Sequence, residues 1–269
     1  MADRRAIDAI IDGAGTIDMR EEGSHGVLLL HGFGDTPQTL SPYAKHLAKS
    51  GFAVFAPVLP GHGRTFDAFM RSRADDWIRA AKDAFVEMRS RYRVVSVSGL
   101  SMGGALAVII AAEYHDTASL VLFAPYLGMP RWLHGAAVTH WVWGRIVGPV
   151  RANSPRSIHD PIEREKNLSY GQVTGRAIFE LSRVVKRARR ALSQVVTPTL
   201  IIQSREDPRV STSVVERAFK KLAAPEKKIV WTTGAGHIIT VDYGRERLFS
   251  EAERWLASHA GRNATAARS

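Results

Sequence analysis

Cysteine is absent from this sequence, and long apolar runs are absent as well. Without cysteine the chain can form no disulfide, no thiolate metal site and no cysteine nucleophile, and a reducing compartment is permitted. The apolar run Ala105–Ala112 is eight residues long, whereas a membrane span needs about 18 residues. The N-terminal segment MADRRAIDAI lacks the apolar core of a secretory signal. We therefore expect a cytoplasmic protein without a transmembrane segment.

Acidic residues are scarce relative to basic ones: 26 Asp and Glu stand against 37 Lys and Arg, which gives a net charge of +11. Such a balance invites a nucleic-acid interpretation, but charge alone supports only non-specific contacts. The basic residues are scattered except in one dense run, which holds Arg183, Lys186, Arg187, Arg189 and Arg190. No zinc-finger spacing, aromatic RNA-binding motif or basic tail accompanies this run. We predict no nucleic-acid partner.

Short apolar runs alternate with amphipathic stretches along most of the chain, a pattern typical of an α/β fold with a mostly parallel sheet. The predicted strands are Val27–Leu30, Ala53–Pro57, Val94–Ser98, Leu120–Ala124, Thr199–Gln203 and Lys228–Thr232. The predicted helices are Ser41–Ser50, Ala74–Ser90, Met102–Tyr114, Thr212–Lys221 and Arg245–His259. The segment Ala9–Arg20 contains the turn pair Asp-Gly and is a candidate for an antiparallel edge hairpin.

The stretch from Pro125 to Pro198 interrupts this rhythm, because no convincing strand occurs in it. It contains an amphipathic helix near Ala177–Leu192, and an unstructured loop of that length is uncommon in a compact domain. We expect a helical cap over residues 126–190, inserted into a core formed by residues 1–125 and 191–262. Residues 263–269 are expected to form a disordered tail. Apolar cap residues are expected to pack as core or to line an acyl pocket; they are Trp132, Leu133, Trp141, Val142, Trp143, Ile146, Val147, Ile178 and Leu181.

The strongest local signal is the pattern G-x-S-x-G around Ser101, between a predicted strand and a predicted helix. A serine at such a turn has a strained backbone that exposes its hydroxyl above the sheet. Gly99 and Gly103 are needed there because strand and helix lie too close for side chains, and Gly104 allows the helix to approach the sheet. The pattern predicts Ser101 as a nucleophile.

A second loop follows the first apolar strand and reads His31-Gly32-Phe33. Such a loop can direct the backbone N–H of Phe33 toward the serine, and the N–H of Met102 is the second donor of a predicted oxyanion hole. One donor of this kind stabilises the transition state by about 3 kcal/mol. For the side chain of His31 we predict a structural role.

A serine nucleophile needs a histidine base and a carboxylate that orients the histidine. Of the 10 histidines, His237 is the predicted base, because it lies in a glycine-rich segment directly after the last predicted strand. Binding and catalytic sites of open α/β sheets lie at the carboxyl ends of the strands. The acid is expected between serine and histidine in the chain. Asp207, which ends a strand, is the preferred acid, and Glu206 is its rival. Asp242 follows the histidine and is expected to be a capping or loop residue.

Together these residues resemble the α/β-hydrolase family over almost the whole chain, and most of all its bacterial carboxylesterases and monoacylglycerol lipases. The resembling segments are LLLHGFGDTP, FAPVLPGHG, SGLSMGG, RAIFELSRVVKRARRAL, TPTLIIQSREDPRV and GHIITVDYGRE. The resemblance implies a mostly parallel eight-stranded sheet, a helical cap, a Ser101–His237–Asp207 triad and lipophilic ester substrates. One departure is visible, because Val210 is followed by Ser211 where the family often has proline.

The sequence therefore predicts a serine hydrolase that cleaves small carboxylic esters of short-to-medium acyl chains, monoacylglycerols among them, through an acyl-enzyme. No cofactor and no metal are needed for this chemistry. One alternative is a thioesterase or acyltransferase with the same triad, in which Arg183–Arg190 meets an anionic carrier. Another is a non-catalytic module that only holds a lipid. Transient lipid contact is compatible with the sequence, and it leaves the oligomeric state open.

Overall fold

A seven-stranded sheet forms the centre of the protein in the computed structural model, which describes residues 9–20, 25–143, 147–152 and 154–260. Its spatial order is β1-β3-β2-β4-β5-β8-β9; β1 is antiparallel to β3, and every other pairing is parallel. The strands are β1 (Ile17–Met19), β2 (His25–Leu30), β3 (Ala53–Ala56), β4 (Val94–Leu100), β5 (Leu120–Phe123), β8 (Thr199–Ser204) and β9 (Lys227–Thr232). The α/β class predicted from the apolar runs is confirmed.

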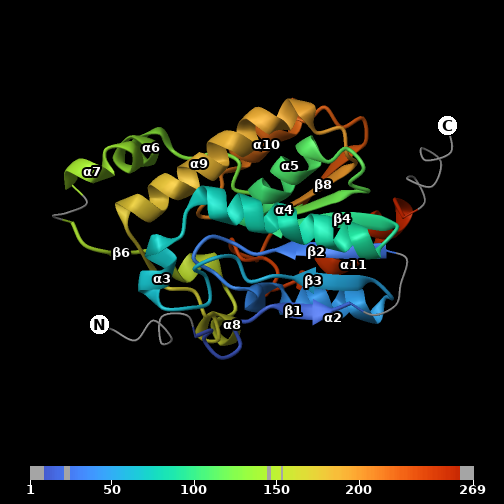
Figure 1. Ribbon diagram of the computed structural model, residues 1–269, viewed down its shortest axis with the longest axis horizontal. Coiled ribbons are helices and arrows are strands. Elements are labelled where there is room, and N and C mark those ends of the chain that lie inside the picture. Colours follow the sequence, from blue (N-terminus) through green and yellow to red (C-terminus); the bar gives the residue numbers. More distant parts are fainter. Residues whose placement is uncertain (1–8, 21–24, 144–146, 153, 261–269) are drawn as a thin grey trace.

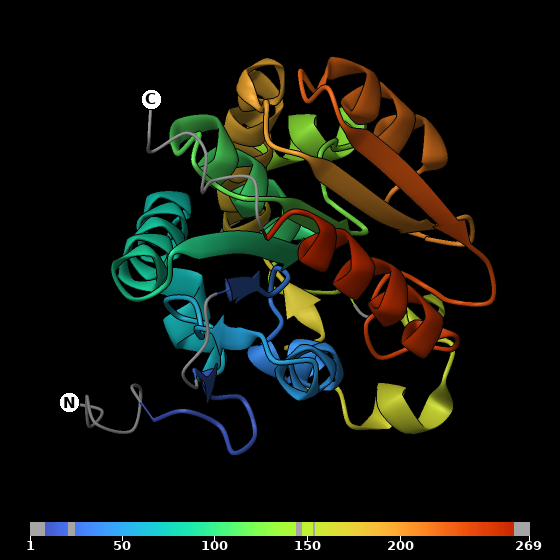
Figure 2. The ribbon, with the colours of Figure 1, turned by 90° about the vertical axis from the view of Figure 1, so that its right-hand side faces the viewer.

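Helices cover both faces of the sheet, as Figures 1 and 2 show. One apolar core joins the sheet to α4 (Ala74–Arg91), α5 (Met102–Glu113), α9 (Gly175–Ala191) and α10 (Thr212–Lys221), and the other joins it to α2 (Ser41–Lys49) and α11 (Arg245–Ser258). Along β2, Leu28 and Leu30 belong to the first core, whereas Val27 and Leu29 belong to the second. This alternation explains why the central strands are continuous apolar runs rather than alternating ones.

The N-terminal segment differs from its prediction, because it forms one short antiparallel edge strand and no hairpin. Residues 9–16 turn instead: the N–H of Ile11 donates to Gly63 O at 2.8 Å, and that of Ala14 donates to Ile11 O at 2.9 Å. The backbone groups that a hairpin partner would need are thus used in a turn. Within the described residues the main sheet accordingly has seven strands, where the family resemblance implied eight.

The insertion between β5 and β8 consists mainly of helices, and it adds a two-stranded ladder that the sequence analysis did not predict. Its elements are α6 (Arg131–Val138), α7 (His140–Trp143), β6 (Val150–Arg151), α8 (Pro161–Glu165), β7 (Gln172–Val173) and α9. The strands β6 and β7 are two residues long, which is too short to produce a periodic signal. Helix α9 packs against α5 through buried Leu181, Val184 and Ala188, so it also covers the sheet domain.

The predicted strands and long helices are all present, and their ends agree within two residues. A short helix that the sequence analysis did not predict, α3 (Phe66–Arg71), begins after Thr65, whose Oγ1 accepts a hydrogen bond from Ala68 N. Short 3₁₀ turns cover Pro37–Leu40, Pro155–Ser157 and Leu192–Gln194. Of the helices in the described ranges, none is long and apolar enough to cross a membrane. The predicted tail 263–269 lies outside the described residues.

Candidate active site

Ser101 occupies the turn between β4 and α5, with a backbone φ of 54° and ψ of −113°. A positive φ is strained for a residue other than glycine. The close approach of strand and helix also explains the neighbouring glycines. A Cβ atom on Gly103 would lie 1.9 Å from Leu30 O, and one on Gly99 would lie 2.2 Å from Gly103 O. The sequence G-x-S-x-G therefore forms the sharp strand-to-helix turn that was predicted from it.

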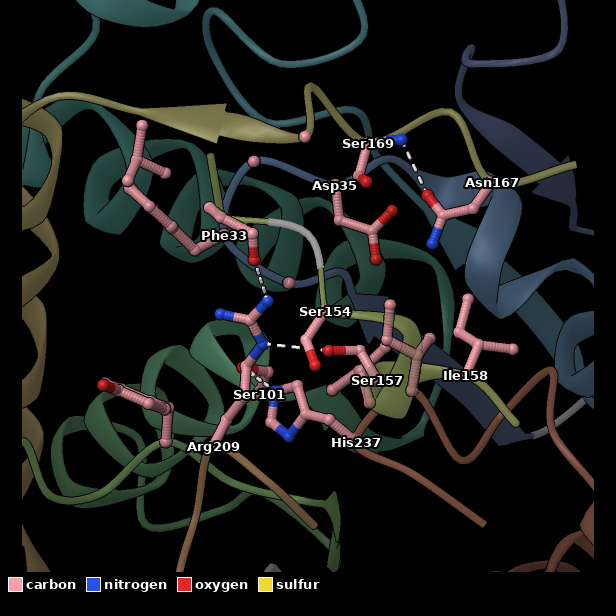
Figure 3. A pocket seen from close by; sticks show the side chains of 18 of the residues that line it. Phe33, Asp35, Ser101, Ser154, Ser157, Ile158, Asn167, Ser169, Arg209 and His237 are labelled. Atoms are coloured by element: carbon pink, nitrogen blue, oxygen red, sulfur yellow. Dashed lines mark hydrogen bonds between the residues drawn. The ribbon is translucent and has the colours of Figure 1, made fainter. Parts of the chain in front are cut away.

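Three side chains that are distant in sequence meet at this turn, and Figure 3 shows two of them, Ser101 and His237. The hydroxyl of Ser101 donates to His237 Nε2 at 2.8 Å. On the other side of the ring, His237 Nδ1–H donates to Asp207 Oδ2 at 2.8 Å. The side chain of His237 is 6% exposed and that of Asp207 is fully buried. This arrangement permits proton transfer from a serine hydroxyl to an imidazole whose tautomer is set by a carboxylate.

Asp207 is held by four hydrogen bonds. Its Oδ1 accepts from the backbone N–H groups of Arg209 at 2.7 Å and Val210 at 3.0 Å. Its Oδ2 accepts from His237 and from Gln203 Nε2, the latter at 2.8 Å. Burial alone would raise the pKa of Asp207, but attraction to His237 and the hydrogen bonds from His237, Arg209 and Val210 outweigh burial and lower that pKa. The carboxyl therefore stays ionised beside the imidazole.

Gln203 is a site residue that the sequence analysis missed, because it was assigned only to the end of a strand. It is fully buried at the end of β8. Its amide also reaches the backbone oxygens of Ser204 and Val210, at 3.2 and 3.4 Å. A glutamine four residues before the predicted acid, at the carboxyl end of a buried apolar strand, is the signal that could have identified it.

Glu206, the rival acid, does not reach the imidazole of His237. Its Oε1 accepts from Gly234 N at 2.8 Å, and its Oε2 lies 3.8 Å from His159 Nδ1. Its side chain remains 47% exposed. The carboxylate that contacts His237 is thus the one preferred from the sequence.

Asp242 does more than the capping or loop role expected of it. It is 1% exposed, and its carboxylate accepts four backbone hydrogen bonds. Two come from the insertion, from His159 at 2.8 Å and Asp160 at 3.0 Å. The other two come from Gly236 at 2.7 Å and Tyr243 at 2.9 Å. Asp242 therefore ties the loop that carries His237 to the insertion.

The predicted oxyanion donors lie at the same place. Within the described part of the chain, the N–H groups of Phe33 and Met102 have no hydrogen-bond acceptor. A Cβ atom on Gly32 would lie 3.6 Å from the Cβ of Ser101, so the loop runs directly past the serine. Both N–H groups thus have no other acceptor among the described residues, and their role as oxyanion donors stays a prediction.

The side chain of His31 is completely buried and holds this loop in place. Its Nε2 accepts from Leu59 N at 3.0 Å, so Nδ1 carries the proton and donates to Gly32 O at 2.9 Å. Burial lowers the pKa of His31 to about 4, which keeps the ring neutral. This geometry agrees with the structural role predicted for the side chain.

A cavity of about 390 Å³ opens above Ser101 and His237 and is roofed by the insertion. Of the apolar insertion residues singled out in the sequence, Leu133, Ile178 and Leu181 line it. Trp132, Trp141, Val142 and Val147 are instead 74%, 72%, 56% and 43% exposed, so neither pocket lining nor core packing describes them. The two tryptophans lie on α6 and α7, whose outer surfaces nothing in the described chain covers. Ile146 lies outside the described residues.

The cavity lining also includes further apolar side chains, such as Phe33, Leu100 and Ile238, and several polar ones. Asp35 is a carboxyl that the sequence analysis did not select; it is 4% exposed and accepts from Thr36 N at 2.9 Å and Thr39 Oγ1 at 3.0 Å. Burial raises the pKa of Asp35 to about 6, although these hydrogen bonds and His237 act in the opposite direction. Within the described ranges, no group of three or more His, Asp or Glu side chains is placed to hold a metal ion.

Known proteins resemble this chain over most of its length. A thermostable monoacylglycerol lipase of Bacillus sp. (strain H-257) is 29% identical over 242 residues, which cover 90% of this chain and 94% of that protein. A carboxylesterase of Bacillus subtilis (strain 168) is 20% identical over 236 residues, 87% of this chain and 93% of that protein. A solved structure of the metagenome-derived lipolytic enzymes LipS and LipT superposes with a TM-score of 0.85 at 28% identity, covering 93% of this chain and all of that one.

Residues 22–243 match the family described as serine aminopeptidase, S33. This match includes β2 to β9, the serine turn, the insertion and the loop that carries His237. It confirms the α/β-hydrolase resemblance that the motifs indicated. The chain therefore belongs to the serine aminopeptidase S33 family of α/β hydrolases.

Proposed function

We propose that this protein is a serine hydrolase that cleaves carboxylic esters of short-to-medium acyl chains, monoacylglycerols among them, and uses Ser101, His237 and Asp207 as its catalytic residues. The observation that carries the proposal is the hydrogen-bonded line from Ser101 through His237 to Asp207 at the base of a cavity. Membership of a serine hydrolase family and the similarity to a monoacylglycerol lipase and a carboxylesterase support it.

Acylation begins when Ser101 Oγ attacks the ester carbonyl carbon while His237 Nε2 takes the hydroxyl proton. The imidazolium that forms is stabilised by the ionised carboxylate of Asp207, which also keeps the ring oriented. The carbonyl oxygen gains negative charge and is bound by the N–H groups of Phe33 and Met102. Collapse of this intermediate breaks the ester bond, and His237 returns the proton to the departing alcohol.

Deacylation repeats these steps with water in place of the serine hydroxyl. His237 takes a proton from water, the hydroxide oxygen attacks the acyl carbon, and Ser101 leaves with the proton from the imidazolium. The net reaction consumes one water and releases one alcohol and one carboxylic acid. Every proton moves through His237, so the distance from its Nε2 to Ser101 Oγ governs both halves of the reaction.

The insertion forms the substrate-binding roof in this proposal, with residues 126–190 as the cap. Leu133, Ile178 and Leu181 give the cavity an apolar wall that suits an alkyl chain. The partner is accordingly a small-molecule ester. Cytoplasmic location stays a prediction, which fractionation of the source cells tests.

A series of p-nitrophenyl esters tests the proposal. Hydrolysis is expected to be fastest between the butyryl and octanoyl esters, and 1-monooctanoylglycerol is expected to be cleaved. Ser101→Ala should lower kcat by about 10⁴-fold or more, with an unchanged circular dichroism spectrum. A maximum at the acetyl ester would contradict the chain-length proposal, and wild-type turnover by Ser101→Ala would overturn the mechanism.

The two alternatives predict different results. A non-catalytic lipid module would not react with a fluorophosphonate probe, whereas we expect the probe to label Ser101. A thioesterase would use the same residues, but part of the basic run invoked for its carrier is already neutralised. Arg183 pairs with Asp75 at 2.7 Å and with Glu180 at 2.9 Å. The family and relatives favour ester hydrolysis.

A further inference from the structure

Two guanidinium groups, those of Arg164 and Arg209, line the same cavity as Ser101. Arg209 follows Asp207 by two residues in the loop after β8, and Arg164 belongs to α8 of the insertion. Figure 3 shows the Arg209 side chain within this cavity, with a dashed line that marks one of its hydrogen bonds to the insertion. Both cations are thus placed where a substrate of Ser101 would lie.

Neither cation is paired with an acid. Arg209 donates from Nε to Ser157 Oγ at 3.1 Å and from Nη2 to the backbone oxygen of Ala152. Arg164 donates from Nη1 to the backbone oxygens of Pro155 and Ile158, at 3.3 and 3.2 Å. All of these acceptors are neutral. Throughout the ranges that the structure describes, no carboxylate oxygen lies within 4.0 Å of either guanidinium.

The hydrogen-bonding capacity of Arg209 is only partly used, because a guanidinium has about five N–H donors and two of its nitrogens donate here. Asp207 is the nearby acid, but its two oxygens already accept four hydrogen bonds. Burial lowers the pKa of Arg209, and the attraction of Tyr126 and Asp207 offsets this effect only in part. Both Arg209 and Arg164 are exposed as residues, so their remaining N–H donors are open to a bound anion, with which a guanidinium forms strong charge-assisted hydrogen bonds.

The lining of the cavity has two characters. One apolar part comes from α6 and α9, through Leu133, Ile178 and Leu181, and other apolar residues such as Phe33 and Ile238 line the cavity beside it. The polar lining comes mainly from residues 154–172 of the insertion, where Ser154, Ser157, Asn167, Ser169 and Gln172 accompany Arg164. An alkyl chain suits the first part, and a polar, negatively charged group suits the second.

We propose that the preferred substrates are esters whose alcohol part carries a phosphate or carboxylate, and that Arg209 and Arg164 bind this anionic group while the acyl chain lies along the apolar wall. A monoacylated glycerol phosphate has this chemistry. The inference rests on the proposed ester hydrolysis, and it adds that the substrate is anionic. Hydrolysis follows the steps already given: water and the ester yield a fatty acid and the anionic alcohol.

The first test compares 1-octanoylglycerol 3-phosphate with 1-octanoylglycerol, which have the same acyl chain and differ by one anionic group. The wild type is expected to have a kcat/KM about 10-fold or more higher for the phosphate. A carboxylate arm uses the monooctanoyl ester of glyceric acid, which tells whether phosphate is required or any anion suffices. Equal or lower kcat/KM for both anionic esters than for the neutral one would overturn the proposal.

Substitution of Arg209 separates recognition from structural support. Arg209→Gln is expected to lower the ratio of kcat/KM for the charged ester to that for the neutral ester by about 10- to 100-fold. Arg209→Lys should restore part of the ratio, because the charge returns without the planar fork. The matched control is Arg205→Gln, an exposed arginine over Trp231 and outside the cavity, which should leave the ratio unchanged. If Arg209→Gln lowered both kcat/KM values equally, Arg209 would be a structural support and the proposal would fail.

Binding measurements keep the two proposals distinguishable. Calorimetry with Ser101→Ala compares octyl phosphate with octanol, and the phosphate is expected to bind at least about 10-fold more tightly. If the variant bound octyl phosphate tightly and the wild type cleaved no ester, the anion site would be supported and the ester-hydrolase function would be overturned. Cleavage of neutral esters without preference for octyl phosphate would sustain the function and overturn the anion site.

Discussion

Asp242 Oδ2 accepts a hydrogen bond from the backbone N–H of Gly236 at 2.7 Å. Gly236 directly precedes His237 and Asp242 follows it, so this bond spans the loop that carries the imidazole. The same carboxylate binds the N–H groups of His159 and Asp160 in the insertion. One buried side chain therefore fixes the position of the imidazole relative to both the sheet domain and the roof of the cavity.

Replacement of Asp242 by alanine should impair both folding and catalysis. It leaves buried N–H groups without an acceptor, so we expect unfolding to require about 3 kcal/mol less, measured by urea titration. The loop should also shift, and a misplaced imidazole should lower kcat on p-nitrophenyl butyrate by about 10- to 100-fold. Asp160→Ala is the control, since the side chain of Asp160 caps α8 through Ile162 N and Glu163 N and alanine keeps the backbone N–H that Asp242 accepts; its kcat should stay near wild type. An unchanged kcat in Asp242→Ala would show that Asp242 does not position His237.

The two neighbouring acids after β8 should differ sharply in their effect on turnover. Asp207→Asn removes the carboxylate that contacts His237, and kcat should fall by about 10⁴-fold. Glu206→Gln alters a side chain that bonds Gly234 N instead, so kcat should remain within about threefold of wild type. Steady-state kinetics on p-nitrophenyl butyrate measure both variants. The reverse order of effects would make Glu206 the catalytic acid.

The serine turn should tolerate no side chain at Gly103. A Cβ atom there would lie 1.9 Å from the backbone oxygen of Leu30, and backbone cannot move aside as a flexible side chain can. Gly103→Ala should therefore lower the free energy of unfolding by about 3 kcal/mol or more. In α6, a Cβ on Gly135 meets nothing within 4 Å, so Gly135→Ala should stabilise the protein by about 0.5–1 kcal/mol. A Gly103→Ala variant as stable as wild type would refute the close packing of β2 and α5.

Asp35 should make the protein less stable as the pH rises from about 4 to about 6. Burial raises the pKa of this carboxyl in the folded state from 3.8 to about 6, so the folded state resists the ionisation that the unfolded chain permits. The loss reaches about 3 kcal/mol at most above both pKa values. Asp35→Asn cannot ionise, so its stability relative to wild type should increase over this pH range. Urea unfolding at pH 4 and pH 7.5 measures this difference, and equal differences at the two pH values would contradict the prediction.

The sequence was sufficient to predict which three side chains meet, because each lies in a short motif at the end of a strand. Ser101, Asp207 and His237 each follow a parallel strand, β4, β8 and β9, and the carboxyl ends of parallel strands meet at one edge of a sheet. Their convergence could therefore be predicted from chain order alone, and the structure brings the three together. Their catalytic roles stay a prediction until the variants are assayed.

The parts that could not be predicted depend on contacts between distant segments. Asp242 was expected to be a capping or loop residue because it follows His237 in the chain, yet two of its four donors lie in the insertion. Trp132 and Trp141 were assigned to core or pocket by their hydrophobicity, and both are exposed. Hydrophobicity predicts burial only where the chain supplies a partner surface. No periodicity revealed which face of α6 or α7 lacks such a surface.

The positive φ of Ser101 means that the residue proposed as the nucleophile lowers the stability of the folded protein. A backbone angle of this kind costs about 1–3 kcal/mol for any residue with a side chain, and glycine adopts it freely. Ser101→Gly is therefore expected to have a higher free energy of unfolding and to lack the nucleophile. Engineering for heat resistance that ranks substitutions by stability alone would select the inert variant first, so such a screen must assay turnover alongside melting temperature.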